Sequence, residues 1–348
     1  MLTITLRDLQ FRRRQFAIAI VGAGLVFALL LILTGISAGF RTEAEGTVDA
    51  AGADAWVVPQ GVEGPFSAAS SLPAKTAAEL RARPDVEDAA PLIALPNVAE
   101  VDGESLTVNV VGVAPQRLGA PGADEGEPLA RSGEAVVGDA TGAKPGSTLA
   151  VAGTDFRVVG MVRDRTYLGG VPVVYVPLAD AQALAYDGQP LASTILVRGS
   201  FDQPAPGLSA LTADGVVEDM LKPLEGATRV IDILRILMWI VAAVIIGAVT
   251  YLSALERVGD FAVMKAVGGE SRSMAAGLAV QAVLASLIAA ALAAALALAL
   301  RPIFPLPVTI DSGAYLALAA IAGLVGVVAS FAALRRVLKV DPALAFSG

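Results

Sequence analysis

The sequence predicts an α-helical membrane protein with four transmembrane helices, arranged as one plus three, and an α+β extracytoplasmic domain inserted between helices one and two. Four stretches without any charged residue are long enough to cross a bilayer. Apolar residues make up 55% of the 348 residues and charged residues only 17%, against about 25% charged in soluble domains. Between the first two stretches the pattern changes to short runs rich in Val and Ile.

Charge-free runs place the four helices. A helix needs about 20 residues to cross about 30 Å of hydrocarbon, and the runs cover residues 15–40, 236–255, 273–300 and 312–334. We expect the first run to be a retained anchor, because it is longer than the 7–15 apolar residues of a signal peptide. The predicted order is a cytoplasmic amphipathic helix (1–14), helix one (15–40), the extracytoplasmic domain with its stalk (41–230), helix two (231–255), a cytoplasmic loop (256–272), helix three (273–300), an outer loop (301–311), helix four (312–334) and a cytoplasmic tail (335–348).

The distribution of charge predicts the orientation. The N-terminal segment, the 256–272 loop and the tail together carry ten Lys and Arg against five Asp and Glu, whereas residues 41–230 carry 13 against 26. Because cytoplasmic segments of membrane proteins are enriched in Lys and Arg, both termini and the loop are expected in the cytoplasm. The acidic segment is therefore expected outside, and the protein in a bacterial cytoplasmic membrane.

The extracytoplasmic segment reads as mixed α and β structure. Its short apolar runs are bounded by Gly, Pro and Asp, as strands are. Strands are predicted at 56–59, 93–101, 105–113, 134–137, 148–151, 156–162, 171–176 and 194–197, and short helices at 73–83 and 178–186. Residues 119–129, dense in Gly, Pro and acidic residues, are predicted to form a loop.

Composition also excludes several functions. The sequence has no Cys and no His, which excludes disulfides and thiolate metal sites and removes the commonest general base. It contains no Gly-x-x-x-x-Gly-Lys-[Ser/Thr] phosphate-binding motif, so any ATP and Mg²⁺ must be bound by another chain. The net charge of −8 disfavours nucleic-acid binding. We expect a non-catalytic chain without a cofactor or metal of its own.

The segment after helix two is the most specific motif in the chain. It reads Glu-Arg-Val-Gly-Asp-Phe-Ala-Val-Met-Lys-Ala-Val-Gly over residues 256–268. A short helix there would place Val258, Phe261 and Ala262 on one face, and the glycines at 268 and 269 would end it. Read as composition alone, the same segment is an ordinary charged end of a membrane helix.

This segment resembles the cytoplasmic coupling loop of FtsX/MacB-type ABC transporter permeases, which typically reads Glu-Arg-x-x-Glu-Phe-Ala-x-Leu-Lys-Ala-x-Gly. Asp260 stands where the family usually has Glu. Residues 6–14, 134–181 and 335–345 resemble the family's first amphipathic helix, its extracytoplasmic core and its C-terminal tail. The resemblance therefore extends over nearly the whole chain.

The resemblance implies a permease that forms a homodimer in the lipid membrane and binds two copies of a cytoplasmic ABC ATPase. The ATPase would supply ATP and Mg²⁺ binding, and the loop would transmit its motion. The coupling role falls on the residues that match the family motif, which are Glu256, Arg257, Asp260, Phe261, Ala262, Lys265 and Gly268.

The cargo is left open among several classes. The layout is similar to the heme-exporter and heterocyst-glycolipid-exporter branch, which implies export of heme or another amphipathic compound. Candidate substrate contacts near the outer ends of helices one and two are Glu43, Glu45, Arg235 and Met238, which otherwise read as solvated or interfacial residues. The alternatives are lipid, lipoprotein or drug efflux, or mechanical activation of a cell-wall hydrolase. From another class, a passive membrane-anchored ligand-binding protein also fits the composition.

Overall fold

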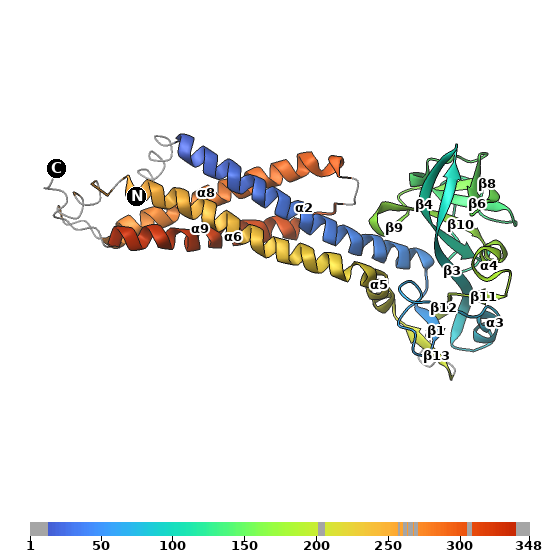
Figure 1. Ribbon diagram of the computed structural model, residues 1–348. Helices are drawn as coiled ribbons and strands as arrows, with labels where there is room; N and C mark the ends of the chain where they lie inside the picture. The colour runs from blue at the N-terminus through green and yellow to red at the C-terminus, as the bar shows by residue number, and fades with distance from the viewer. Residues whose placement is uncertain are drawn as a thin grey trace. The chain divides into compact units, whose positions relative to one another are not determined.

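The computed structural model describes residues 13–200, 206–256, 258–259, 263, 267, 271–304 and 308–338 (Figure 1). The chain divides into two compact units. The helical unit comprises Met1–Ala38 and Ala227–Gly348, and the α+β domain comprises Gly39–Gly226. The predicted combination of apolar helices with an α+β domain is confirmed.

Four helices in the described residues are long and apolar enough to cross a membrane, as predicted. They are α2 (Arg13–Ala51), α6 (Glu225–Leu255), α8 (Ser271–Leu300) and α9 (Ser312–Leu338). All four are longer than their charge-free runs, and two extend furthest: α2 continues past residue 40 to Ala51, and α6 begins at Glu225. Charged residues such as Glu and Arg favour helix as strongly as Leu does, so the loss of apolarity does not end the helix. Gly52, with a φ of +62°, follows the end of α2.

Small residues bring the helices of the helical unit close together. A Cβ added to Gly326 of α9 would lie 2.6 Å from Ser286 Oγ of α8, and one added to Gly24 of α2 would lie 3.0 Å from Leu292 of α8. The rings of Phe27 in α2 and Trp239 in α6 are 5.3 Å apart. Such close backbone approach at small residues is typical of helix packing in lipid.

A mixed sheet of eleven described strands forms the centre of the α+β domain. The main path runs β13-β1-β12-β3-β4-β10-β6-β8-β5, with β7 paired to β3 and β8, and β9 paired to β10. The β4–β10 and β6–β8 pairs are parallel, and the other pairs are antiparallel. The strands are β1 (Ala55–Pro59), β3 (Val86–Val101), β4 (Glu104–Val113), β5 (Glu125–Gly126), β6 (Glu134–Gly138), β7 (Thr148–Val151), β8 (Thr154–Val162), β9 (Thr166–Tyr167), β10 (Val171–Pro177), β12 (Thr194–Gly199) and β13 (Leu208–Leu211); β2 (Leu72–Pro73) and β11 (Leu191–Ala192) form a separate pair.

Helices cover both faces of this sheet. On one face, α3 (Thr76–Arg81) and α4 (Leu178–Tyr186) pack through Ala77, Leu80 and Ala181. On the other face, the end of α2 and α5 (Ala213–Leu221) pack through residues such as Val48 and Met220. Neighbouring strand residues alternate between the two cores, as a period of two requires.

The eight predicted strands and two predicted helices of this domain are present; β7 and α4 have the predicted bounds, and the others have shifted ends. The largest shift is in β3, which begins at Val86 instead of residue 93. The elements β2, β5, β9, β11 and β13 were not predicted; the first four have two residues each, which are too few to show an alternating pattern. The expected loop at 119–129 contains the two-residue strand β5.

Candidate functional site

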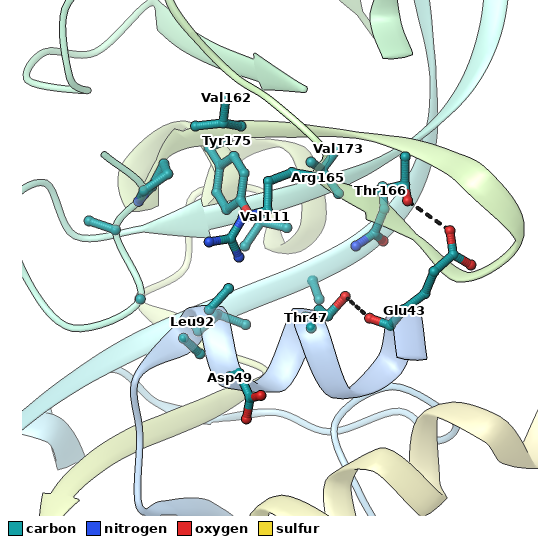
Figure 2. Close-up of a pocket in the computed structure, with 18 of the residues that line it drawn as sticks. Glu43, Thr47, Asp49, Leu92, Val111, Val162, Arg165, Thr166, Val173 and Tyr175 are labelled. Carbon is teal, nitrogen blue, oxygen red and sulfur yellow. Dashed lines mark hydrogen bonds between the residues drawn. The ribbon is translucent and has the colours of Figure 1, made fainter. Parts of the chain in front are cut away.

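A pocket of about 760 Å³ lies within the α+β domain, between the last turns of α2 and one face of the sheet (Figure 2). One wall comes from α2, through residues that include Glu43 and Thr47. The opposite wall comes from β1, β3, β4, β8 and β10, and Phe66 and residues 119–124 and 164–166 add further lining. Its volume falls in the range of about 300–1,000 Å³ that is usual for small-molecule sites.

Most of the deep lining of the pocket is apolar. Leu92, Val111, Val162 and Val173 are buried and lie around the pocket (Figure 2). The rings of Trp56 and Phe66, which also line it, are 5.8 Å apart. These residues belong mainly to the core on the α2 side of the sheet, so the pocket is an unfilled part of that core.

Two buried hydrogen-bond donors in the lining have no partner among the described residues. They are the indole Nε1 of Trp56 and the amide Nδ2 of Asn109, whose side chains belong to residues only 1% and 4% exposed. Nearly all buried polar groups in native proteins are hydrogen-bonded, and leaving one without a partner costs about 1–3 kcal/mol. Both residues lie in the wall of one pocket, which makes this pocket the candidate functional site of the domain.

Arg165, an exposed residue, is the one cation among the described residues that line this pocket. The guanidinium of Arg165 lies beside the ring of Tyr175 and points into the pocket (Figure 2). Among the described residues Arg165 forms no ion pair within 4.0 Å. Burial raises the pKa of Tyr175 above its ordinary value, and the positive charge of Arg165 opposes this rise only in part. Tyr175 therefore keeps its hydroxyl proton at neutral pH.

The loop that carries Arg165 is held by close backbone contacts. Asp164 adopts a left-handed conformation with a φ of +52°, which turns the chain before Arg165. A Cβ added to Gly138 would lie 2.6 Å from the carbonyl oxygen of Arg165, so only glycine fits at the end of β6. The side chain of Arg165 thus projects from a constrained backbone.

Glu43, one of the predicted substrate residues, lines this pocket, but its carboxylate is already bound to the same loop. It accepts hydrogen bonds from Thr166 Oγ1 at 2.7 Å, Gly169 N at 2.7 Å and Gly170 N at 3.1 Å. Its position in the structure indicates that it holds the loop against α2. Glu45 is exposed on the same helix, 3.9 Å from Arg41, and does not line the pocket.

The other predicted substrate residues lie in the helical unit. Arg235 and Met238 are both on α6, and Arg235 Nη1 is 3.0 Å from Asp232 Oδ1 one turn earlier. The four predicted contacts thus divide between the two units, Glu43 and Glu45 in one and Arg235 and Met238 in the other.

Of the predicted coupling segment, the structure describes only Glu256, Val258, Gly259, Val263 and Val267. Glu256 follows the last residue of α6 and is exposed. The remaining coupling residues, Arg257, Asp260, Phe261, Ala262, Lys265 and Gly268, lie outside the described residues.

Asp219 of α5 fixes another part of the pocket wall. This residue is 1% exposed, and its carboxylate accepts hydrogen bonds from Phe66 N at 2.9 Å, Ser67 N at 3.3 Å and Ser67 Oγ. A Cβ added to Gly64 would lie 2.0 Å from the Asp219 carboxyl carbon. Burial and the nearby Asp219 charge raise the pKa of Tyr167 to about 12. The loop bearing Phe66 is thereby tied to α5.

Sequence reasoning did not find Trp56, Asn109, Arg165 or Asp219 as site residues. One signal was present for Asn109, which is a lone amide inside the apolar run Val-Asn-Val-Val at 108–111. The sequence offers no comparable signal for Trp56, Arg165 or Asp219, because each is an ordinary residue type for its local pattern.

Comparison with known protein families identifies both parts of the chain. Residues 16–210 match the MacB-like periplasmic core domain, and residues 233–342 match the FtsX-like permease C-terminal domain. Among solved structures, the chain is similar to the periplasmic region of MacB from Actinobacillus actinomycetemcomitans, with 15% identity, 49% of this chain and 94% of that chain covered, and a TM-score of 0.36. It is also similar to the extracellular domain of the noncanonic ABC-type transporter YknZ from Gram-positive bacteria. The identity is 12%, the match covers 46% of this chain and 99% of that chain, and the TM-score is 0.36.

Full-length relatives support the same family. The uncharacterized ABC transporter permease Rv2563 of Mycobacterium tuberculosis is 42% identical over 348 residues, which cover 100% of both chains. A second one from the same organism, Rv0072, is 41% identical with the same coverage. The matches extend over both units and confirm the family that the coupling segment resembles. The chain belongs to the FtsX/MacB-type family of ABC transporter permeases.

Proposed function

We propose that the chain is the permease subunit of an ABC exporter that moves a hydrophobic or amphipathic compound, with heme among the candidates. A separate cytoplasmic ATPase, present in two copies, binds ATP and Mg²⁺ and drives a homodimer of this chain. One observation carries the proposal: a chain of an ABC permease family has no phosphate-binding motif in its 348 residues. The ATP-hydrolysing part must then come from a partner.

The pocket supports the export part of the proposal. Its wall includes the last turns of α2, a helix whose apolar part is long enough to span a membrane. Glu43 ties α2 to the Thr166–Gly170 side of the pocket through three hydrogen bonds. A shift of α2 driven by the ATPase would therefore move a wall of the pocket. In this proposal, residues 256–268 receive the motion in the cytoplasm, and the α+β domain responds outside.

The chain purified alone should not hydrolyse ATP, and an ATPase encoded beside its gene should co-purify with it and become active. The reason is that all phosphate-binding chemistry resides in the partner. The measurement is phosphate release by the chain, by the ATPase and by the complex, each in nanodiscs. A catalytically inactive ATPase, with its phosphate-binding Lys replaced by Ala, is the matched control. Hydrolysis by the isolated chain, or by its complex with the inactive ATPase, would show that the assignment is wrong.

A further inference from the structure

We propose that the pocket in the α+β domain binds an amphipathic compound with one carboxylate head and an unbranched apolar chain, as in a medium- or long-chain fatty acid. The head group would meet Arg165, Tyr175, Asn109 and Trp56, and the chain would fill the apolar part. This inference deepens the proposed function, and it rests on that function only for the step from binding to export.

The first argument is the kind of polar group that the pocket leaves without a partner. Trp56 Nε1 and Asn109 Nδ2 are both donors, and Arg165 carries further donors without an ion pair among the described residues. An indole N–H and a guanidinium can only donate hydrogen bonds. A ligand head group that supplies acceptor atoms would therefore complement this lining, and a carboxylate supplies two acceptor oxygens.

The second argument is the charge in the lining, which includes acidic as well as basic residues. Glu43 is bound to Thr166, Gly169 and Gly170, and Asp124 Oδ2 accepts a hydrogen bond from Arg163 N at 2.8 Å. Figure 2 shows the carboxylate of Asp49 turned away from Arg165 and Tyr175.

Arg165 is thus the one positive charge in the described lining, and both it and the neighbouring Asp164 are exposed. A ligand with several negative charges, such as a nucleotide, would be repelled by the carboxylates of the lining. A ligand with a single carboxylate fits the single guanidinium.

The third argument is the apolar part of the pocket. Leu92, Val111, Val162 and Val173 present buried aliphatic side chains, and Trp56 and Phe66 add aromatic surface. Each buried methylene strengthens binding by about fourfold, so two more carbons should strengthen it by about fifteenfold until the space is filled. A cavity of about 760 Å³ gives an alkyl chain room for this series.

The test uses the full chain in nanodiscs, with Trp56 as the reporter. The sequence has two tryptophans, so the Trp239→Phe chain leaves Trp56 alone, and its unpaired indole N–H should respond to a new acceptor. Decanoate, decanol and decylamine share one chain length and differ only in the head group. Titrations against empty nanodiscs correct for partition into lipid. We expect saturable binding of decanoate, at least about tenfold weaker binding of decanol, and still weaker binding of decylamine.

Two arginines of the same loop provide a matched pair of variants. Arg165→Gln removes the guanidinium from the pocket and should weaken decanoate binding by about tenfold, with little effect on decanol. Arg163→Gln removes a neighbouring guanidinium that bonds Glu125 and does not line the pocket, so decanoate binding should be unchanged. Asn109→Asp keeps the shape of the side chain but replaces a donor with an acceptor, and should also weaken decanoate binding. Circular dichroism spectra and unfolding curves establish that each variant is folded.

The proposal is overturned if decanoate shows no saturable binding, if decanol or decylamine binds as tightly as decanoate, or if Arg163→Gln weakens binding as much as Arg165→Gln. Because the titration contains no ATPase, such a failure leaves the permease assignment intact. Conversely, failure of every ATPase to assemble with the chain would leave the binding result intact.

Discussion

Replacing Asp219 with alanine should lower the free energy of unfolding of the α+β domain by about 3 kcal/mol. Its buried carboxylate accepts hydrogen bonds from two backbone N–H groups and one hydroxyl of residues 66 and 67. Hydrogen bonds to charged groups contribute about 1.5–3 kcal/mol each, and their loss leaves the donors without partners. Chemical unfolding of the Trp239→Phe chain, followed by Trp56 fluorescence, measures the effect, because Trp56 lies against Phe66.

Glu218→Ala is the matched control for this variant. Glu218 is adjacent on α5 and exposed, so its replacement should change the free energy of unfolding by less than about 0.5 kcal/mol. Gly64→Ala should resemble Asp219→Ala, because its new Cβ would occupy the position of the carboxylate. Equal stability of Asp219→Ala and Glu218→Ala would show that Asp219 does not hold the Phe66 loop.

Phe261→Ala should weaken binding of the ATPase by tens to hundreds of times. Phe261 is the aromatic residue of the proposed coupling segment, and we propose that it enters an apolar groove of the partner. Truncation of such a buried residue commonly costs about 2–4 kcal/mol. The measurement is the dissociation constant of the ATPase from the chain immobilised in nanodiscs.

Phe66→Ala makes the same truncation in the α+β domain and provides the control. Phe66 lines the pocket and packs against the rings of Trp56 and Tyr167, whose centres are 5.8 and 6.0 Å from its own. Its loss should alter ligand binding but leave the affinity for the ATPase unchanged. If Phe261→Ala binds the ATPase as tightly as Phe66→Ala does, the coupling assignment is incorrect.

The sequence was sufficient to predict the four apolar helices and most strands, because both depend on local pattern. Charge-free length identifies a membrane helix, and alternating Val and Ile identify a half-buried strand. The helices α2 and α6 continue beyond their charge-free runs because Glu and Arg, which interrupt a hydropathy pattern, are good helix formers.

The pocket could not be predicted in the same way. Its residues come from distant parts of the chain: Trp56 from β1, Asn109 from β4, Arg165 from a loop and Glu43 from α2. Only the folded arrangement around the sheet brings them together. Glu43 shows why sequence position alone does not define such a site. It was predicted as a substrate contact because it lies near the end of the first span. The structure shows its carboxylate bound to Thr166 and the glycines at 169 and 170.

The rate of ATP hydrolysis by the reconstituted complex, with and without an amphipathic compound, tests the central claim most directly. The compounds are decanoate and heme, and the ATPase alone in the same nanodiscs provides the baseline. If the chain couples hydrolysis to export of an amphipath, at least one compound should raise the rate of the complex and leave the rate of the ATPase alone unchanged. A rate that neither compound changes, or one that changes equally without this chain, would contradict the account.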